Sequence, residues 1–519
     1  MKRYILILTS LLIFSQSCFC NNYNIKNYGA IGDGKASNTE IFKKVIGIAA
    51  QEGGGTIYVP SGKFLTGTIE LKSNIILYLE AGAVIIGSRN FDDYPIVLLR
   101  FQGEECFGHA PLIYGRDLGN IAVKGKGTIN GQGEVWWNRF KLFTNRGKEK
   151  PILNDGEKLT LELNKKTNNN NPFSRPCLIE FINCKNIELS GLILINSPVW
   201  TVHPVYCENV NITGITIINP PEAPNTDGIN PDSSKNVRIS NCNISTGDDC
   251  ITIKSGLNED GRRVGKPSED IAITNCIMMR GHGGIVLGSE MSGGIRNVVV
   301  SNCVFNGTDR GIRFKAPRGR GNVIENVSFN NIIMHDILKA GIEIDMLYFD
   351  STNKPIPFDI TTPTIKNVFI SNVSGENIVE ALRIIGIPES PVLNVRISNL
   401  NFMGNGAGKI ENVKGLLIKD SYIQNAGNKP LEVSHVASAM FNNFEIENKR
   451  IEMPLLLLSD IERFSFYKIG IDTKPLIPFH LQGMIKDLEI TYAGKNMLFK
   501  EFNFEKVAKL NRTLNLVTD

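Results

Sequence analysis

A short motif recurs along the middle of this sequence and constrains the fold more than any other feature. Each copy opens with Asn, or once with Asp, and continues with Val, Ile or Leu at alternate positions. Repeats of this size with alternating apolar residues are typical of stacked β-coils, and they fit leucine-rich or helical repeats badly. The copies begin at Asn186, Asn209, Asn236, Asp270, Asn297, Asn326, Asn367 and Asn394. We therefore predict an all-β fold, a right-handed single-stranded parallel β-helix.

Four polar segments occupy matching places in successive repeats. They are Asn225–Asp227, Gly247–Asp249, Gly281–Gly283 and Arg313–Lys315. A second short strand in each of these coils contains an Ile that sets a common register. Equivalent positions of neighbouring coils should lie about 4.8 Å apart along the axis. The residues expected to stack in one column are Asp227, Asp249, Gly283 and Arg310.

The same register predicts a compact polar site on the outer surface. Asp248 falls beside His282 in the alignment. Arg313 and Lys315 are two residues apart in one strand, so their side chains share a face. Three clustered carboxylates raise one another's pKa, so one of them should be protonated and able to act as an acid. Such a cluster can bind calcium, but the adjacent cations argue against a metal ion as the main guest, and we predict no metal or cofactor.

Length and composition indicate one soluble, elongated domain. At 519 residues the chain exceeds most compact cores, but a solenoid grows by adding coils. We expect residues 21–519 to form a single domain, with an N-terminal cap over about 23–75, coils over about 75–440 and a C-terminal cap over about 441–519. The net charge of +4 is too small to favour a class of partner, and we expect a monomer without a nucleic-acid partner or a transmembrane segment.

The first twenty residues predict export. Met1–Cys20 has a basic start, an apolar core and small polar residues, which is typical of a secretory signal peptide. Cleavage after Ser17 would expose Cys18 for lipidation, whereas a plain cut near Cys20 would release the chain. The periplasm, the outer membrane and the medium therefore all stay open as destinations.

Three segments depart from the repeat. A helix is predicted over 39–51, with Asn38 as its N-cap and with Ile41, Val45 and Ile48 on the side that plugs the solenoid. Residues 138–175, rich in Lys, Asn and Glu, are predicted to form a long loop, and residues 254–269 a second one. Such loops usually shape the binding cleft of a solenoid.

The cysteines after the signal peptide predict buried ladders. Cys242, Cys276 and Cys303 share one repeat position, and Cys184 and Cys207 share another. Stacked cysteines could be bridged, but a strand-to-strand pair strains the disulfide dihedral. We therefore favour free thiols that pack as small apolar side chains.

The four polar segments together resemble the polygalacturonase family, glycoside hydrolase family 28, over residues 23–450. The resemblance implies a pectin-lyase-like β-helix that hydrolyses α-1,4 bonds between galacturonates of pectin with inversion and without metal. It implies that Asp248 is the general acid, that Asp227 and Asp249 activate the water, and that His282 supports the acid. The residues that it implies for substrate binding are Asn225, Arg313, Lys315 and, as a looser match, Tyr348.

Several alternatives stay open at this point. The sequence is also similar to bacterial exo-acting members, and the two predicted loops could close one end of the cleft, so we favour exo action over endo action. A rhamnogalacturonan-directed galacturonidase of the same fold is the nearest alternative. A pectate lyase would require calcium and give unsaturated products, whereas a non-catalytic pectin-binding β-helix would leave the stacked carboxylates without a task.

Overall fold

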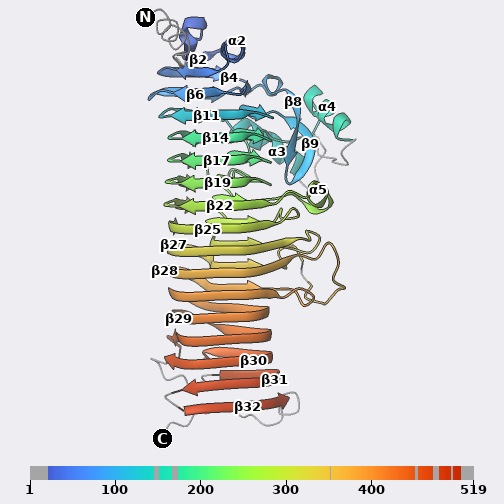
Figure 1. Cartoon of the computed structure of the whole chain (residues 1–519), viewed down its shortest axis with the longest axis vertical. Coiled ribbons are helices and arrows are strands. Elements are labelled where there is room, and N and C mark those ends of the chain that lie inside the picture. Colours follow the sequence, from blue (N-terminus) through green and yellow to red (C-terminus); the bar gives the residue numbers. More distant parts are fainter. Residues whose placement is uncertain are drawn as a thin grey trace, which may run out of the picture.

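The computed structural model describes residues 21–144, 151–165, 173–350, 352–450, 454–470, 479–492 and 495–503. The predicted signal peptide, Met1–Cys20 with Cys18, lies outside this part of the chain. The described residues wind into a long stack of parallel coils, with the N-terminal strands at one end and the C-terminal strands at the other (Figure 1). The predicted parallel β-helix is confirmed.

Each coil contributes strands to three parallel ladders. The first ladder stacks β1 (Asn22–Asn24), β3 (Gly55–Val59), β6 (Ile75–Leu79), β11 (Gly119–Gly125), β14 (Lys185–Ser190), β17 (Glu208–Thr213), β19 (Lys235–Ser240), β22 (Ser268–Thr274), β25 (Ile295–Asn306), β27 (Val323–Asp345), β28 (Thr364–Ile385), β29 (Val392–Asn448) and β30 (Leu456–Gly470). The second stacks β2 (Asp33–Ser37), β4 (Gly62–Thr66), β7 (Ala83–Gly87), β12 (Thr128–Asn130), β15 (Ile193–Ile195), β18 (Thr216–Ile218), β20 (Asn243–Ser245) and β23 (Ile277–Arg280). The third, the site ladder, stacks β5 (Ile69–Glu70), β10 (Ile113–Arg116), β13 (Ile179–Ile182), β16 (Val202–Val205), β21 (Ile251–Ile253), β24 (Ile285–Gly288) and β26 (Arg310–Lys315).

The recurring Asn marks a corner of the coil. Asn209 has a left-handed backbone with φ 58°, and Asn186 and Asn236 have φ 57° and 55°. Asn tolerates this conformation better than other residues with a side chain. Its amide also donates and accepts, so Asn209 donates to Asn186 Oδ1 at 3.1 Å and accepts from Asn236 at 3.3 Å. Backbone geometry and a side-chain ladder together account for the repeated Asn.

Asn209→Ala is expected to be less stable than Asn209→Gly by about 1 kcal/mol. Both variants lose the ladder hydrogen bonds, but alanine is strained in the left-handed region and glycine is not. Urea unfolding of both variants measures the difference. An alanine variant as stable as the glycine variant would contradict the backbone explanation of the repeat.

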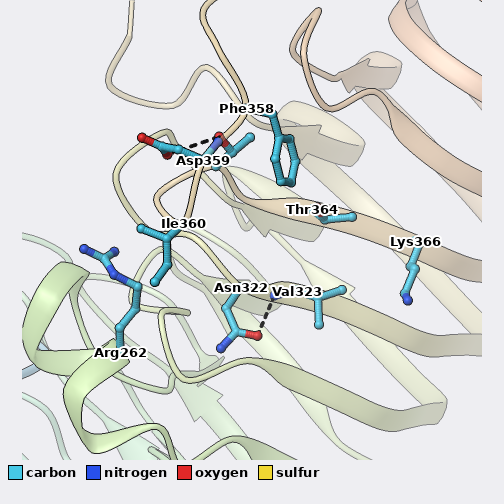
Figure 2. A pocket seen from close by; sticks show the side chains of 9 residues that line it. Arg262, Asn322, Val323, Phe358, Asp359, Ile360, Thr364 and Lys366 are labelled. Carbon is cyan, nitrogen blue, oxygen red and sulfur yellow. Dashed lines mark hydrogen bonds between the residues drawn. The ribbon is translucent and has the colours of Figure 1, made fainter.

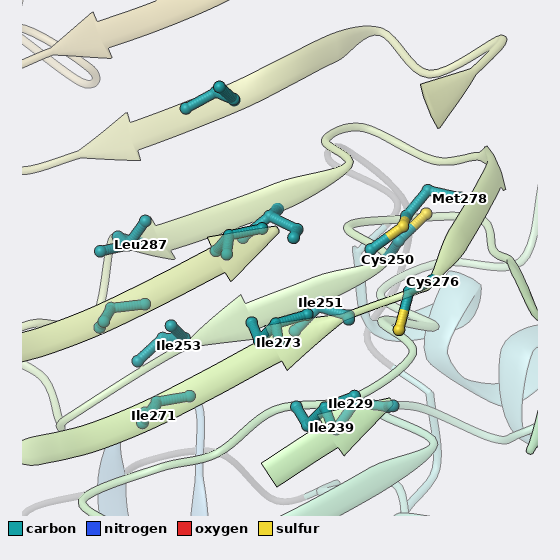
Figure 3. Packing of buried hydrophobic residues seen from close by; sticks show 14 of the residues in the cluster. Ile229, Ile239, Cys250, Ile251, Ile253, Ile271, Ile273, Cys276, Met278 and Leu287 are labelled. Atoms are coloured by element: carbon teal, nitrogen blue, oxygen red, sulfur yellow. The ribbon is translucent and has the colours of Figure 1, made fainter. Parts of the chain in front are cut away.

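Apolar side chains of the three ladders fill the inside of the coil. Figure 3 shows Ile229, Ile251 and Ile273 packed there with Leu287, and the four side chains are at most 1% exposed. The eight cysteines among the described residues are free and buried. Cys242, Cys276 and Cys303 stack, since the strands that follow them pair in register. The prediction of free, buried cysteine ladders is confirmed for these residues.

The N-terminal helix is present, with two corrections. Helix α2 (Thr39–Gln51) begins and ends as predicted, but its buried face is Phe42, Val45, Ile46 and Ala49, while Ile41 and Ile48 are only partly buried. Asn38 stands at the N-cap without a capping hydrogen bond. Its side chain instead accepts from Ile31 N and donates to Leu65 O, so it ties the preceding turn to strand β4.

The coils extend further at both ends than expected. The first ladder starts with β1, well before residue 75. Strand β30 continues it after residue 440, and β31 (Phe479–Tyr492) adds another parallel strand. An antiparallel partner, β32 (Lys495–Asn503), then closes the stack. The segment predicted as a C-terminal cap, about 441–519, is therefore mostly regular coil in the described residues.

The two predicted loops contain helices. Residues 138–175 include part of α3 (Glu134–Thr144) and all of α4 (Asp155–Asn164), and residues 254–269 include α5 (Asn258–Val264). Two 3-10 turns, η1 (Ile25–Tyr28) and η2 (Phe91–Asp93), precede them in the chain. An antiparallel hairpin, β8 (Ile96–Phe101) and β9 (Glu104–His109), projects from the same side of the stack as α3, α4 and α5 (Figure 1). None of the described helices is long and apolar enough to cross a membrane.

Candidate active site

The register of the site ladder brings the predicted residues together. Ile229 bridges to Ile251, which pairs with Ile285, and Ile285 pairs with Ile312. The residues two positions before these Ile therefore form the predicted column of Asp227, Asp249, Gly283 and Arg310. Gly281 allows the loop carrying His282 to approach, because its φ is 152° and a Cβ there would lie 2.5 Å from Asp248 O.

Asp248 is the accessible carboxylate of the three. Its side chain is 19% exposed, and His282 Nδ1 lies 3.1 Å from its Oδ1. Asn225 Nδ2 lies 3.4 Å from its Oδ2. The hydrogen bond to Asp248 raises the pKa of His282, so the imidazole is readily protonated beside this carboxylate. Asp248 is therefore reachable from solvent while His282 and Asn225 hold its two oxygens.

Asp249 is buried and paired with both predicted cations. Lys315 Nζ lies 2.7 Å from Asp249 Oδ2, and Arg313 Nη1 lies 3.5 Å from Oδ1. Burial alone would raise the pKa of Asp249, but Lys315 and Arg313 outweigh it and lower that pKa to about 2. Asp249 is therefore ionised at neutral pH.

Asp227 carries the raised pKa that clustering predicted. It is 3% exposed, and burial raises its pKa to about 7. The nearby charges of Asp248 and Asp249 act in the same direction, while Lys254 opposes them. Like charges were the expected cause of a raised pKa, but loss of hydration is the larger cause at this buried carboxyl.

The side chains of Arg313 and Lys315 are less exposed to solvent than we expect of a pair that binds substrate. They are 4% and 6% exposed. Arg313 Nε also donates to Glu343 Oε1 at 3.0 Å. The ring of Tyr348 lies 5.1 Å from the Arg313 guanidinium and 5.5 Å from the Lys315 ammonium. The structure thus brings Tyr348 to the two cations, which already neutralise carboxylates of the chain.

Several polar residues of the site escaped the sequence analysis. Arg175, nearly fully buried, donates to Asn225 Oδ1 at 2.7 Å, so it orients the amide that faces Asp248. Glu343 lies one coil beyond Arg313 in exact register, and the alignment of repeats could have found it. Lys254, at 3.5 Å from Asp227, occupies the repeat position of Lys315 two coils earlier. Arg175 lies outside the aligned segments and gave no such signal.

A buried histidine cluster lies on the same face, towards the N-terminus. Cys177, Glu180 and His203 offer three ligand atoms within 4.8 Å of one another. His203 already contacts acids on both sides, with Nδ1 3.5 Å from Glu180 and Nε2 3.4 Å from Asp232. Burial lowers the pKa of His203, but these two carboxylates outweigh it and raise the pKa overall. We interpret the cluster as a set of buried ion pairs centred on His203.

One surface cavity is separate from this chemistry. A cavity of about 510 Å³ lies between Arg262 of α5 and the segment carrying Phe358 and Ile360 (Figure 2). Its other lining residues are Asn322, Val323, Asp359, Thr362, Thr364 and Lys366. None of the predicted site residues lines it.

Comparison with known proteins identifies the family of the chain. The sequence profile of glycosyl hydrolases family 28 matches residues 51–422. A probable polygalacturonase of Vitis vinifera is 34% identical over 76% of this chain and 77% of its own length. An exo-poly-alpha-D-galacturonosidase of Dickeya chrysanthemi is 26% identical over 82% of this chain and 71% of its own. The crystal structure of an exopolygalacturonase from Thermotoga maritima superposes with a TM-score of 0.64 at 29% identity, covering 93% of this chain and 95% of that one.

Proposed function

This chain belongs to family 28 of the glycosyl hydrolases, and from that membership we propose that it hydrolyses α-1,4-galacturonosidic bonds of pectin with inversion. The observation that carries the proposal is the cluster of Asp227, Asp248 and Asp249 on neighbouring coils, with His282 bonded to the most exposed of them. Inverting hydrolysis needs one carboxylic acid to protonate the leaving oxygen and a carboxylate to activate water.

The three carboxylates differ enough to divide these tasks. Asp248 is the general acid, because it alone of the three is partly exposed and it can be recharged with a proton beside His282. Asp227 and Asp249 hold and activate the water. Asp249 supplies a permanent negative charge, and Asp227, with a pKa of about 7, is the better proton acceptor of the two.

The cations prepare the site for an acidic sugar. Arg313 and Lys315 hold the carboxylate of the galacturonate beside the cleaved bond, with Tyr348 against its ring and Asn225 within reach of a hydroxyl. Fixed cations suit an anionic substrate, and a guanidinium can bind a carboxylate through two hydrogen bonds. In the free enzyme Asp249 and Glu343 keep both cations in place.

We propose exo action, in which the hairpin β8–β9 limits the path of the substrate beside Asp227. Trp200 occupies the column one coil before Asp227 and is 3% exposed beneath the hairpin. The hairpin tip contacts the α5 segment, where Leu257 N donates to Gly103 O at 2.9 Å. A path limited on this side would admit only the end of a substrate chain. Family membership alone leaves both exo and endo action open.

The purified protein, incubated with polygalacturonate and a chelator, is expected to release reducing ends without an unsaturated product. Galacturonate monomer alone would support exo action, and a ladder of oligomers would contradict it. Unsaturated products that require calcium would identify a lyase and overturn the proposal. No product from polygalacturonate, with release of galacturonate from rhamnogalacturonan fragments, would move the enzyme to that substrate.

We also propose that the protein is exported, because its substrate is a polymer outside the cell, and that it acts as a monomer. The basic and apolar pattern of residues 1–20 supports export, and Cys18 supplies a lipidation site. Metabolic labelling with a fatty acid, compared between the wild-type chain and Cys18→Ala, distinguishes an anchored form from a released one.

A further inference from the structure

A second lysine, outside the four polar segments of the sequence analysis, contacts a proposed catalytic carboxylate. Lys254 follows strand β21 and is 4% exposed. Its Nζ lies 2.8 Å from Glu290 Oε2 and 3.5 Å from Asp227 Oδ2. The ammonium also lies 4.5 Å from the centre of the Trp200 ring, which closes it off from the N-terminal side.

The two distances imply that Glu290 holds the Lys254 ammonium and that this ammonium acts on Asp227. The shorter contact to Glu290 fixes the ammonium, and the longer one leaves Asp227 Oδ2 stabilised by charge without a short hydrogen bond. Thr252 Oγ1 contacts the same oxygen at 3.5 Å. Asp249, by contrast, accepts a bond of 2.7 Å from Lys315. Asp227 is therefore the carboxylate of this pair whose oxygen is freer to take a proton from water.

An isolated carboxylate at this depth would be neutral. Loss of hydration disfavours the charged form unless an opposite charge lies close by. The other charges that face Asp227 do not offset its burial, because Asp248 and Asp249 disfavour its ionisation. The two cations among them that favour it have other partners, since Lys315 is bonded to Asp249 and Arg175 to Asn225. The groups that face Lys254 are Asp227, Asp232, Asp249 and Glu290.

We propose that Lys254, held by Glu290, is a positioning residue that stabilises the ionised form of Asp227 and leaves its oxygen available as the base that activates water. This rests on the proposed function, in which Asp227 receives the proton of the attacking water. Lys254 acts through Asp227 and does not bind the reacting sugar. Burial opposes the ionisation of Asp227 and Lys254 favours it, so the two together place the pKa of this carboxyl near neutrality.

The test is the pH dependence of kcat/KM in Lys254→Met and Glu290→Gln. Without Lys254 the pKa of Asp227 rises, so the acid limb should move to higher pH by at least about one unit, which is a tenfold change in ionisation. The loss of kcat should be largest at low pH and shrink as pH rises, with KM changed less than about threefold. In Glu290→Gln the released ammonium can move closer to Asp227, so the acid limb should move to lower pH.

An infrared titration of the Asp227 carboxyl supplies a readout that needs no substrate. The band of the protonated group is identified by its absence in Asp227→Asn. The expected result is a higher pKa in Lys254→Met than in the wild type, and an unchanged pKa overturns the proposal even if activity falls. A raised KM with an unmoved pH profile would make Lys254 a substrate ligand and would also overturn it.

The same measurements separate this proposal from the function on which it rests. A raised Asp227 pKa with an unmoved rate profile would show that Asp227 is not the base, and the error would then lie in the proposed mechanism. If Lys254→Met does not fold, the opposite displacement expected for Glu290→Gln still decides, since an unmoved limb and an unmoved pKa in that variant contradict the anchoring by Glu290.

Discussion

Asp248→Asn is expected to lower kcat by more than about a hundredfold while substrate binding is retained, since general acid catalysis is typically worth 10² to 10⁴. An amide has the shape of the carboxyl but cannot deliver a proton to the leaving oxygen. The contact of 3.1 Å to His282 can persist through the amide, so the loss should arise in the chemical step. Steady-state kinetics on oligogalacturonides give kcat and KM separately.

Asp270→Asn is the matched control for this substitution. Asp270 occupies the corner position that Asn fills in the other repeats, and it accepts a ladder bond of 3.0 Å from Asn297. The same chemical change should therefore leave kcat unaltered at this distant corner. Calorimetric binding of an oligogalacturonide to Asp248→Asn completes the test. Wild-type turnover in Asp248→Asn would mean that another group is the acid.

The fold and the column of site residues were predictable because a parallel β-helix converts sequence alignment into spatial contact. One Asn at a corner and one Ile at the start of a strand gave the register, and that register placed Asp248 beside His282 correctly. Glu343 follows from the same alignment, since it pairs with Arg313 in the next coil. Residues of this kind can be predicted from the sequence once the repeats have been aligned.

The depth of the site was not predictable from the alignment. Arg313 and Lys315 were expected to face outward, and they do, but loops and neighbouring side chains cover them to 4% and 6% exposure. The low exposure of these two side chains comes from segments outside the repeat. It also explains why burial, which no register encodes, has the largest effect on the pKa of Asp227.

Helix α4 shows what a local signal could have added. The Asn154 side chain accepts from Glu157 N and the Glu157 carboxylate accepts from Asn154 N, so the two residues form a capping box. Asn followed three positions later by Glu is a recognised helix start. The abundance of Lys, Asn and Glu in residues 138–175 favoured a loop in the sequence analysis. The Asn154–Glu157 motif, had it been weighed, would have predicted the helix correctly.

The hairpin β8–β9 was missed because a distant contact fixes it to the coils. Arg100 Nη1 lies 2.8 Å from Asp232 Oδ1, and both side chains are fully buried although 132 residues separate them. Nothing near Arg100 in the sequence indicates that pairing. Leu99 and Phe101 on either side of it pack with Trp200 in a small apolar cluster on the outer face of the site ladder.

Arg100→Ala is expected to lower the free energy of unfolding by about 3–5 kcal/mol, the usual effect of removing one partner of a buried ion pair. Asp232 would keep its contact with His203 but would lose the guanidinium that neutralises it. Denaturant unfolding measures the loss. Arg296→Ala is the control, because Arg296 pairs with Glu269 at 2.7 Å but is 45% exposed, and an exposed pair is worth about 1 kcal/mol or less.

The same substitution tests whether the hairpin determines where the substrate chain is cut. A hairpin released from Asp232 no longer walls the cleft beside Trp200, so a longer stretch of polymer can pass Asp227 and oligomers should join the monomer among the products. Arg296→Ala should keep the wild-type products. A folded Arg100→Ala variant that still releases only monomer would place the barrier elsewhere, with α5 as the next candidate, since Leu257 and Asp260 contact the hairpin from that side. Product length therefore separates the hairpin's effect on stability from its effect on specificity.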